Sequence, residues 1–494
     1  VIVPEGKEGD RLLEAMAPLI RLREEEQGAE IITYRVPPDM NAKDAVSWKD
    51  EVYWSEDVEE DDRPLYLMLL GDLDQVSLEL QHSLANCALV GRAHFANAKG
   101  KANLDNYAAY AAKVVGFAQN GTLGERPDML FHIARDGTNA TQSGEARLLN
   151  PCLEAAMKNR DAGRLPVTEV CEIEAESTDE FLAAGANARP SVLLSVSHGV
   201  GAPRKGWSSE EEQWRKQGAL VMGHHDVLDA ERLGTQTFLP GGLWFLLACF
   251  GAGTPNVSAY HAWLSLLAQE GKFSGKANSV LASLPAQGAR PFVAALPQAA
   301  LANPNGPLAI IGHMDLAWTY GFSSATNLSE SRKSRFYSVL EVMARGSRAG
   351  VGIEALMRFY RETNDALMAG YQAEADARAH QRDAGTNKAE RGHLWMLRND
   401  LRGYVLLGDP ATRLPLAKNA LGKPDKPDKP MTEPVITVNV PPPVDVSVAL
   451  KEAAVLSLIH GEEAPIAIAR RAGTTVVELF SWFDAYRSGG RSRL

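Results

Sequence analysis

Two stretches of the sequence decide the fold: SVLLSVSHGVG at residues 191–201 and LWFLLACFGAGTP at residues 243–255. Each opens with a continuous apolar run, which is typical of a strand buried on both faces of a parallel sheet. Each run ends at a reactive side chain, His198 in the first stretch and Cys249 in the second. Because functional groups in open α/β sheets gather at the carboxyl ends of the strands, we expect this imidazole and this thiol on neighbouring strands.

The rest of the chain alternates between short apolar runs and helical patterns. This alternation predicts an α/β fold with a mostly parallel sheet that is covered on both faces. Further strands are expected at residues 2–3, 31–34, 64–70, 88–92, 129–133, 309–312 and 403–407, and helices at 12–22, 106–117, 141–159, 335–344 and 352–379.

The chain is expected to divide into four segments. Residues 1–124 form a smaller N-terminal α/β subdomain, and residues 125–417 form the larger domain that carries His198 and Cys249. Residues 418–446 contain seven of the 27 prolines, with the repeat KPDKPDKP, which predicts a semi-rigid linker. Residues 447–494 form a small helical module whose glycine and paired threonines resemble a helix-turn-helix.

Composition excludes several classes of protein. With 494 residues, 45% apolar residues and 23% charged residues, the chain has an ordinary globular composition. Its net charge of −11 argues against a protein that coats nucleic acid or an anionic membrane. Four cysteines are too few for a disulfide scaffold, no apolar run approaches the ~20 residues of a membrane span, and no secretory signal is seen. We therefore expect a cytoplasmic protein without a membrane partner.

The pair of strand ends points to nucleophilic chemistry. A thiol needs a neighbouring base to become a nucleophilic thiolate, and His198 could be that base for Cys249. Gly199 leaves its backbone bare, so its N–H and that of Cys249 could together form an oxyanion hole. The simpler alternative is an inert buried thiol and a structural histidine. The remaining cysteines, Cys87, Cys152 and Cys171, are expected to be structural.

Over residues 1–416 the sequence resembles the caspase-like (clan CD) cysteine peptidases, and within them the gingipain-like peptidase C25 group and its relatives with CHAT domains. The resemblance rests on the two stretches above and on LRGYVLLGDPATRL at 401–414, with PLYLMLLGDLDQVSLELQ at 64–81, ALVGRAHF at 88–95, QGALV at 217–221 and IIGHMDLAW at 310–318. It implies a caspase-like α/β/α sandwich and a cysteine endopeptidase that works without a cofactor. It also implies that His198 is the general base and acid and that Cys249 is the nucleophile, with the oxyanion held by the N–H groups of Gly199 and Cys249.

Substrate preference is predicted from the same resemblance. Gingipains that cut after arginine place an acidic residue in the pocket for that side chain, but residues 82–86 of this chain contain no acid. Asp315 is the best replacement, which predicts cleavage after a basic residue; the alternative is that Asp315 makes a structural hydrogen bond. The other expected substrate-binding residues are Trp318, Gln217 and Glu79, with Asp226 as a weaker acidic candidate.

Neither a metal nor a nucleotide phosphate is expected. The run His224-His225-Asp226 is an isolated cluster whose adjacent side chains point apart, so it does not predict a metal site. The glycines of residues 199–206 lack the spacing of a phosphate-binding loop.

Regulation and partners are predicted from two further segments. The polar segment 201–218 is expected to be a solvated loop or, alternatively, a gating loop that an upstream protease cuts in a zymogen. The resemblance places such enzymes in regulated prokaryotic cascades, including antiviral defence. In the C-terminal module, a net charge of +1 favours a partner protein bound through Val476, Phe480 and Trp482 over nucleic acid. The simpler alternative is that these apolar residues pack in the core of the module. A catalytically silent scaffold and a DNA-associated regulator are the alternative functions.

Overall fold

The computed structural model describes residues 1–417, except 121–123, 187–188, 224–225, 270–276, 286–287, 325–329 and 383–387, together with scattered residues between 451 and 482. By its internal contacts the chain divides into two compact units, Val1–Leu421 and Gly422–Leu494. The predicted linker 418–446 lies outside the described residues.

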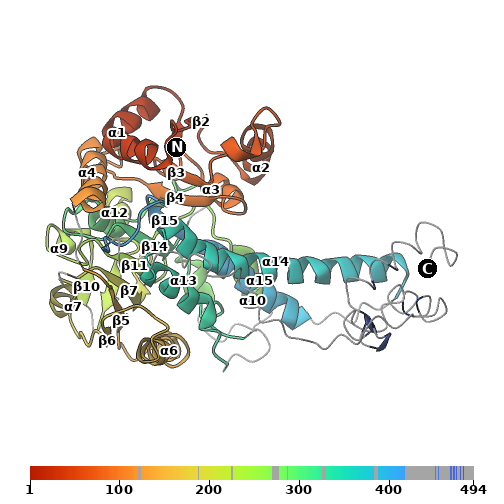
Figure 1. The fold of residues 1–494 in the computed structure, drawn as a ribbon. Coiled ribbons are helices and arrows are strands. Elements are labelled where there is room, and N and C mark those ends of the chain that lie inside the picture. The colour runs from red at the N-terminus through yellow and green to blue at the C-terminus, as the bar shows by residue number, and fades with distance from the viewer. Residues whose placement is uncertain are drawn as a thin grey trace. The chain divides into compact units, whose positions relative to one another are not determined.

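One ten-stranded sheet runs through the first unit (Figure 1). Its strands, in spatial order, are β2 (Tyr34–Val36), β1 (Ile2–Pro4), β3 (Tyr66–Leu70), β4 (Leu89–Ala93), β15 (Tyr404–Gly408), β14 (Ala309–His313), β11 (Leu243–Leu247), β7 (Ser191–Val196), β5 (Asp128–Ile133) and β6 (Val170–Glu172). Strand β15 pairs with β14 antiparallel, whereas β14, β11, β7, β5 and β6 pair parallel in turn. The predicted mostly parallel sheet is confirmed.

Helices cover both faces of the sheet. In β3, Leu67 and Leu69 pack in a cluster with the helices α2 (Ala42–Trp48) and α3 (Leu78–Leu84). Their neighbours Met68 and Leu70 pack in the main core with α1 (Lys7–Gln27) and α4 (Leu104–Asn120). The alternation follows from the two-residue period of a strand and gives the α/β/α layers that the sequence predicts.

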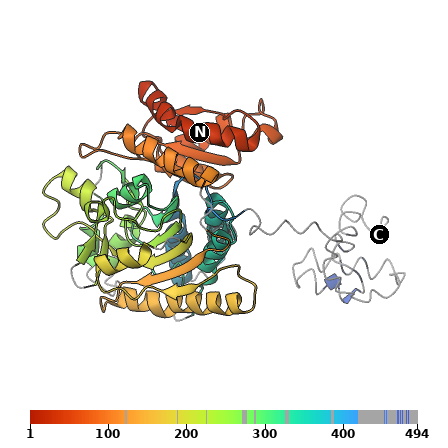
Figure 2. The ribbon, with the colours of Figure 1, turned by 60° about the vertical axis from the view of Figure 1, so that its left-hand side comes forward.

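The remaining elements complete these layers and the loops at their edges (Figure 2). The helices are η1 (Lys49–Tyr53), η2 (Glu60–Asp62), α5 (Asn139–Gly144), η3 (Glu145–Leu149), α6 (Asn150–Asp161), α7 (Thr178–Gly185), α8 (Glu210–Lys216), α9 (Ala230–Leu233), α10 (His261–Gln269), α11 (Ala277–Leu281), α12 (Ala295–Ala302), α13 (Ser334–Ala344), α14 (Ala349–Ala379) and α15 (Lys388–Gly403). The short strands are β8 (His198–Gly199), β9 (Leu220–Met222), β10 (Asp226–Leu228), β12 (Gly253–Thr254) and β13 (Phe292–Val293).

Some elements differ from the predictions. The expected strand at 31–34 begins only at Tyr34, and the expected helix at 141–159 is three successive helical pieces, with a π-helix at Glu145–Leu149. Helix α15 was not predicted, and the polar segment 201–218 contains the short helix α8. The sheet continues from residues of the expected subdomain 1–124 into the expected domain 125–417, and the boundary between them stays a prediction.

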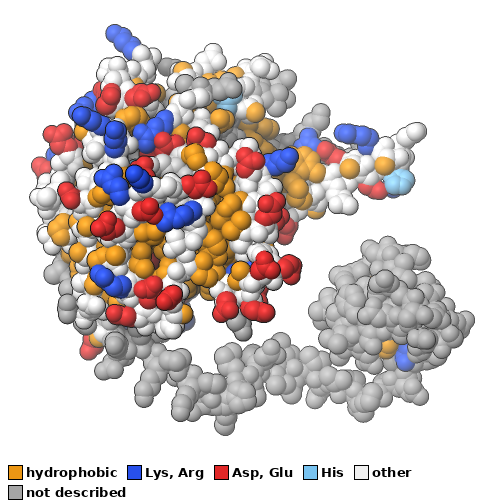
Figure 3. All heavy atoms as spheres, turned by 90° about the horizontal axis from the view of Figure 1, so that it is seen from above, with side chains coloured by type: hydrophobic (Ala, Val, Ile, Leu, Met, Phe, Trp, Pro, Cys, Tyr) orange, Lys and Arg blue, Asp and Glu red, His pale blue; other side chains and the backbone are white. Residues whose placement is uncertain are grey.

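Three features bear on possible binding partners: the apolar character of the helices, the distribution of surface charge and the described residues of the second unit. Among the described residues, no helix combines the length and the apolar character needed to cross a bilayer. Acidic and basic side chains are interspersed over the face seen in Figure 3, with hydrophobic side chains between them. In the C-terminal unit the described residues include helical positions at 468–469, 479 and 482. Trp482 is buried there under Lys451, whereas Val476 and Phe480 lie outside the described residues.

Candidate active site

Strand register brings the two predicted reactive residues to one place. Strands β7 and β11 are parallel neighbours, and Val196 pairs with Leu247 at their carboxyl ends. His198 and Cys249 each follow two residues after this pair, and the Ser197 N–H continues the ladder by donating to the Leu247 carbonyl at 3.1 Å. The sequence-based prediction of an imidazole and a thiol on adjacent strand ends is therefore confirmed by the register.

Gly199 lies directly against the backbone of Cys249. A Cβ atom at Gly199 would overlap the Cys249 carbonyl oxygen, so only glycine fits at this position. Gly199, which directly follows His198, is therefore in close contact with the backbone of Cys249. Their predicted role as oxyanion donors stays a prediction.

The turn that carries the thiol is strained and firmly held. Phe250 has a φ of 57°, which lies in the left-handed region that side chains other than glycine seldom occupy. Its N–H donates to the Asp315 carbonyl at 2.8 Å, and the Ala252 N–H donates to the His313 carbonyl at 2.9 Å. Strand β14 and its extension therefore fix the backbone conformation in which Cys249 leaves the sheet.

His198 is oriented by residues that follow the next strand of the sheet, β5. Its Nε2 lies 2.9 Å from the Thr138 hydroxyl and 3.5 Å from an Asp136 carboxylate oxygen. Asp136 in turn accepts hydrogen bonds from the Thr141 hydroxyl at 2.7 Å and from the Thr138 N–H at 3.0 Å. Burial of Asp136 works in the opposite direction, but these hydrogen bonds and the nearby imidazole lower the pKa of its carboxyl. The result is an imidazole with a persistent anionic neighbour.

The thiol has a different environment. The Cys249 sulfur lies 3.7 Å from the Ala317 carbonyl oxygen, to which it donates its proton. Burial, with a further contribution from the buried carboxyls of Asp315 and Asp400, raises the pKa of this thiol to about 11. At neutral pH the group is therefore a protonated thiol that is turned toward a backbone carbonyl.

Asp315 is buried and fully engaged in hydrogen bonds. Its carboxylate accepts from the Ser258 hydroxyl at 3.1 Å, the Ala259 N–H at 3.0 Å and the Leu316 N–H at 2.8 Å. Burial raises the pKa of Asp315 to about 6. These contacts match the structural alternative for Asp315, and they also hold the segment that follows the nucleophile turn.

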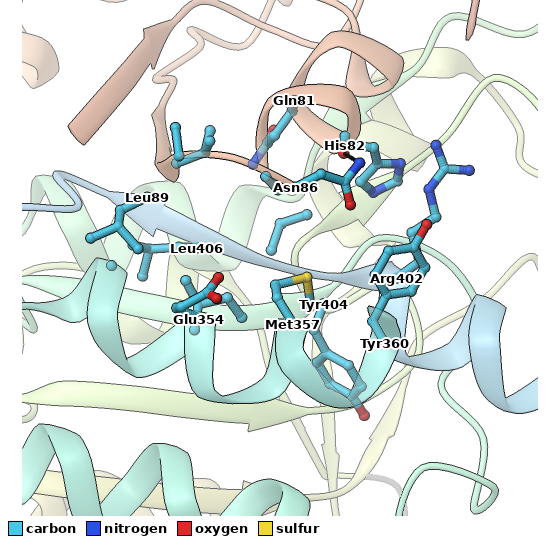
Figure 4. A pocket seen from close by; sticks show the side chains of 16 residues that line it. Gln81, His82, Asn86, Leu89, Glu354, Met357, Tyr360, Arg402, Tyr404 and Leu406 are labelled. Carbon is cyan, nitrogen blue, oxygen red and sulfur yellow. Dashed lines mark hydrogen bonds between the residues drawn. The ribbon is translucent and has the colours of Figure 1, made fainter. Parts of the chain in front are cut away.

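The structure brings two of the predicted acidic residues together. Glu79 and Asp315 line one cavity of about 60 Å³, and Arg402 lies in the same wall with its guanidinium 3.1 Å from Glu79. A second cavity of about 20 Å³, enough for about one water molecule, shares His82 and Arg402 with the first. Figure 4 shows these two side chains beside each other, with Met357 and Glu354 across the cavity.

The other predicted residues are placed as follows. The Trp318 ring packs edge-on against Tyr260, with ring centroids 5.6 Å apart, next to the carbonyl that contacts the thiol. Gln217 is buried at the end of α8, where its side-chain oxygen accepts from Gln213 at 2.7 Å. Asp226 contacts Arg232 and accepts the Thr178 N–H at 2.6 Å. His224 and His225 lie outside the described residues, and no three potential ligands converge among the residues that the structure describes.

Sequence reasoning missed Asp136, Thr138 and Asp400. The first two follow the apolar run 129–133 in the sequence ARDGT, so the strand-end reasoning that found His198 and Cys249 was available for them as well. Asp400 lies at the end of the unpredicted helix α15, far from Cys249 in sequence.

Comparison with known proteins gives similarities among solved structures only. No family model matches the chain, and no curated protein does. A structure described as a protease aligns over 84% of this chain and 78% of its own, with 12% identity and a TM-score of 0.46. The Arg-specific cysteine proteinase gingipain R aligns over 84% and 77%, with 12% identity and a TM-score of 0.46. A complex of the pro- and mature domains of Porphyromonas gingivalis RgpB aligns over 84% and 79%, with 12% identity and a TM-score of 0.42. Gingipain structures are thus among those that this chain resembles, as the sequence motifs predict.

Proposed function

We propose that the protein is a cysteine endopeptidase in which His198 and Cys249 are the catalytic pair. One observation carries the proposal: the imidazole and the thiol follow register-matched ends of adjacent parallel strands. The contact of Gly199 with the Cys249 backbone and the Asp136–His198 pair support it. A structural histidine and an inert thiol would need none of these arrangements.

The geometry divides the work between the two nitrogens of the imidazole. Thr138 and Asp136 hold Nε2, which leaves Nδ1 to take the proton of the Cys249 thiol. The thiolate attacks a peptide carbonyl, and the N–H groups of Gly199 and Cys249 hold the oxyanion. His198 then returns the proton to the leaving amine, and water hydrolyses the thioester to release the acid and restore the thiol.

The substrate preference belongs to the same proposal. Glu79 and Asp315 line a shared cavity, which supports cleavage after arginine or lysine. Arg402 already pairs with Glu79 there, so a basic substrate side chain would have to exchange with this guanidinium. Trp318 would form part of the adjacent wall, and Gln217 lies next to Gly218, where a Cβ would overlap the Phe250 carbonyl.

Regulation is proposed in line with the sequence motifs. The enzyme would be cytoplasmic and would cleave partner proteins in a prokaryotic proteolytic or defence cascade. An upstream protease would activate it by cutting within 201–218, and the C-terminal module would recruit a partner protein. The protonated, half-buried Cys249 supports a resting state that needs such activation.

The same protonated thiol favours a second candidate, a catalytically silent scaffold. The pKa of Cys249, raised to about 11 by burial, opposes formation of the thiolate. The Cys249 sulfur donates a hydrogen bond to the Ala317 carbonyl, and the His198 imidazole is hydrogen-bonded to the Thr138 hydroxyl. Each of the two groups thus has a partner other than the opposite member of the pair.

The test uses the full chain, with and without limited proteolysis, on a library of peptides and on candidate partner proteins. We expect cleavage by the wild type to be lost in Cys249→Ala and in His198→Ala. Cys171→Ala, which removes a thiol on β6 away from the site, is the matched control and should cleave normally. Cleavage that persists in Cys249→Ala would end the assignment, and a preference for leucine or aspartate would remove Asp315 from substrate binding.

A further inference from the structure

The fully buried carboxylate of Asp400 holds the segment that contacts the Cys249 thiol. Asp400, in the last turn of α15, accepts the Trp318 N–H at 2.8 Å with one oxygen and the Gly321 N–H at 2.9 Å with the other. One side chain therefore holds two points of the turn formed by residues 317–321. The first residue of that turn, Ala317, supplies the carbonyl that accepts the Cys249 thiol.

We propose that Asp400 is a positioning residue, which sets the turn 317–321 against Cys249 and thereby controls both the reactivity of the thiol and the binding of substrate. The inference rests on the proposed peptidase function and extends it to a residue that no sequence motif indicates.

A second set of contacts locks Asp400 to the end of β14. His313, which is fully buried, accepts the Asp315 N–H at Nδ1 at 3.0 Å, so its Nε2 carries the proton donated to the Asp400 carbonyl at 3.0 Å. Burial lowers the pKa of His313 to about 4, which keeps this bridge neutral. The same imidazole thus ties the segment before the turn to the helix that carries Asp400.

The surroundings leave little room for another arrangement. A Cβ at Gly321 would lie 2.7 Å from an Asp400 carboxylate oxygen, and a Cβ at Gly403 would overlap the His313 ring. Arg335 holds the far side of the turn, because it donates to the Gly321 carbonyl at 2.8 Å and to the Ser323 carbonyl at 3.3 Å.

Asp400 acts on the thiol in two ways that oppose each other. As an acceptor it holds the turn in place, which a substrate-binding wall requires. As a buried negative charge it raises the pKa of the Cys249 thiol, which holds the nucleophile in its protonated form. The other titratable groups whose charges couple to Asp400 or to this thiol are those of Arg335, Tyr260, Tyr404 and Asp315.

These opposite effects predict a signature for Asp400→Asn in the full chain. The amide keeps one acceptor, loses the charge and points an NH₂ group at the second N–H. We expect Cys249 to react about three to ten times faster with iodoacetamide at pH 7.5, because loss of the buried charge lowers the pKa of the thiol and raises the thiolate fraction. At the same pH, we expect the rate of peptide cleavage to fall and KM to rise.

The matched control is Asp409→Asn. Asp409 is also buried next to β15, where it accepts from Arg23 at 2.9 Å and from the Ala411 N–H at 2.9 Å, but at the opposite end of that strand. It should leave the pH dependence of Cys249 alkylation unchanged. Alkylation is measured by peptide mass spectrometry and needs no substrate, so failure of this inference and failure of the peptidase assignment are distinguishable.

An Asp400→Glu variant and hydrogen exchange of the turn test the role of Asp400 further. Asp400→Glu keeps the charge but displaces the turn, so cleavage should fall with a smaller change in the pH dependence of alkylation. In the wild type, a peptide covering residues 316–322 should be protected from hydrogen exchange. An unprotected segment, or an Asp400→Asn variant that loses stability with an unchanged alkylation profile, would show that Asp400 is only a structural residue.

Discussion

The two halves of the candidate site differ in their surroundings. His198 has a side chain that is 39% exposed, and polar groups that follow β5 orient its Nε2. Cys249 is half-buried near two buried carboxyl groups, and its sulfur donates to a backbone carbonyl. The imidazole therefore has an anionic neighbour, whereas the thiol is held in its protonated form. Under the proposed function, activation would act on the thiol side, where the turn 317–321 and its support by Asp400 lie.

The largest expected effect comes from disturbing the contact between Gly199 and the Cys249 backbone. Gly199→Ala would place a methyl group where the Cys249 carbonyl lies, so the two strand ends would have to separate. We expect at least about a hundredfold loss of kcat/KM, because a shift of about 1 Å in reacting groups costs this much. Peptide cleavage assays on the purified full chain measure the loss.

Gly201→Ala is the control for that variant. A Cβ at Gly201 would meet only the Phe250 ring at 3.8 Å, which is ordinary contact, so activity should be retained. Equal activity of the two variants would mean that the contact between Gly199 and Cys249 has no catalytic importance.

On the imidazole side, Asp136→Asn removes the negative charge beside His198. We expect kcat to fall about tenfold to a hundredfold, since Thr138 still holds Nε2 and preserves part of the orientation. Asp161→Asn, at an exposed carboxylate paired with Arg160, serves as the control. A kcat equal to that of the wild type would exclude Asp136 from orienting the base.

On the thiol side, the buried carboxyls predict a dependence of stability on pH. Burial raises the pKa of Asp315 to about 6 and that of Asp400 to about 7 from an ordinary value of 3.8. Between pH 4 and 7 the folded chain keeps protons that the unfolded chain has lost. Through these two groups the free energy of unfolding therefore falls as the pH rises across that range.

Asp400→Asn should flatten this fall, because the amide does not titrate. Urea unfolding at pH 5 and pH 7.5 measures the slope for the wild type and the variant. A variant with the full wild-type slope would show that Asp400 is ionised throughout and that its burial is offset by its two hydrogen bonds.

The smallest expected effect concerns the segment 201–218, which follows the imidazole. Trp214 of α8 lies under the guanidinium of Arg290, 5.2 Å from the ring centroid, and fills the space beside Gly100. Trp214→Ala should cost less than about 2 kcal/mol of folding free energy. It should also make the segment more sensitive to trypsin. A trypsin digestion time course checks this, and unchanged digestion would mean that α8 is held by other contacts.

The sequence predicts much of the fold and places His198 and Cys249 on adjacent strand ends, for a physical reason. Strands buried on both faces appear as continuous apolar runs, and a reactive residue within two positions of such a run must lie at the edge of the sheet. Asp136 follows the run 129–133 in a similar way, but a carboxylate after a strand is common and does not by itself indicate a site.

Other parts of the site depend on contacts between distant segments. Nothing near Asp400 in the sequence indicates that it holds Trp318 and Gly321, since this depends on how α15 meets the end of β14. Helix α15 itself had a signal in Met396, Leu397 and Leu401, which are spaced for one helical face and are buried. The raised pKa of Cys249 follows only from three-dimensional burial and could not be predicted from its neighbours.

The position of β15 has a consequence for the order in which the molecule is made. This strand, Tyr404–Gly408, is the last of the sheet in sequence, yet it lies between β4 and β14. During synthesis, the strands on its two sides therefore have no common neighbour until residue 408 has left the ribosome. Asp400 and Gly403 directly precede β15 and emerge with it. A nascent chain that ends before β15 thus carries the imidazole and the thiol but lacks the support that Asp400 gives to the turn 317–321. The site is therefore completed only when β15 completes the sheet.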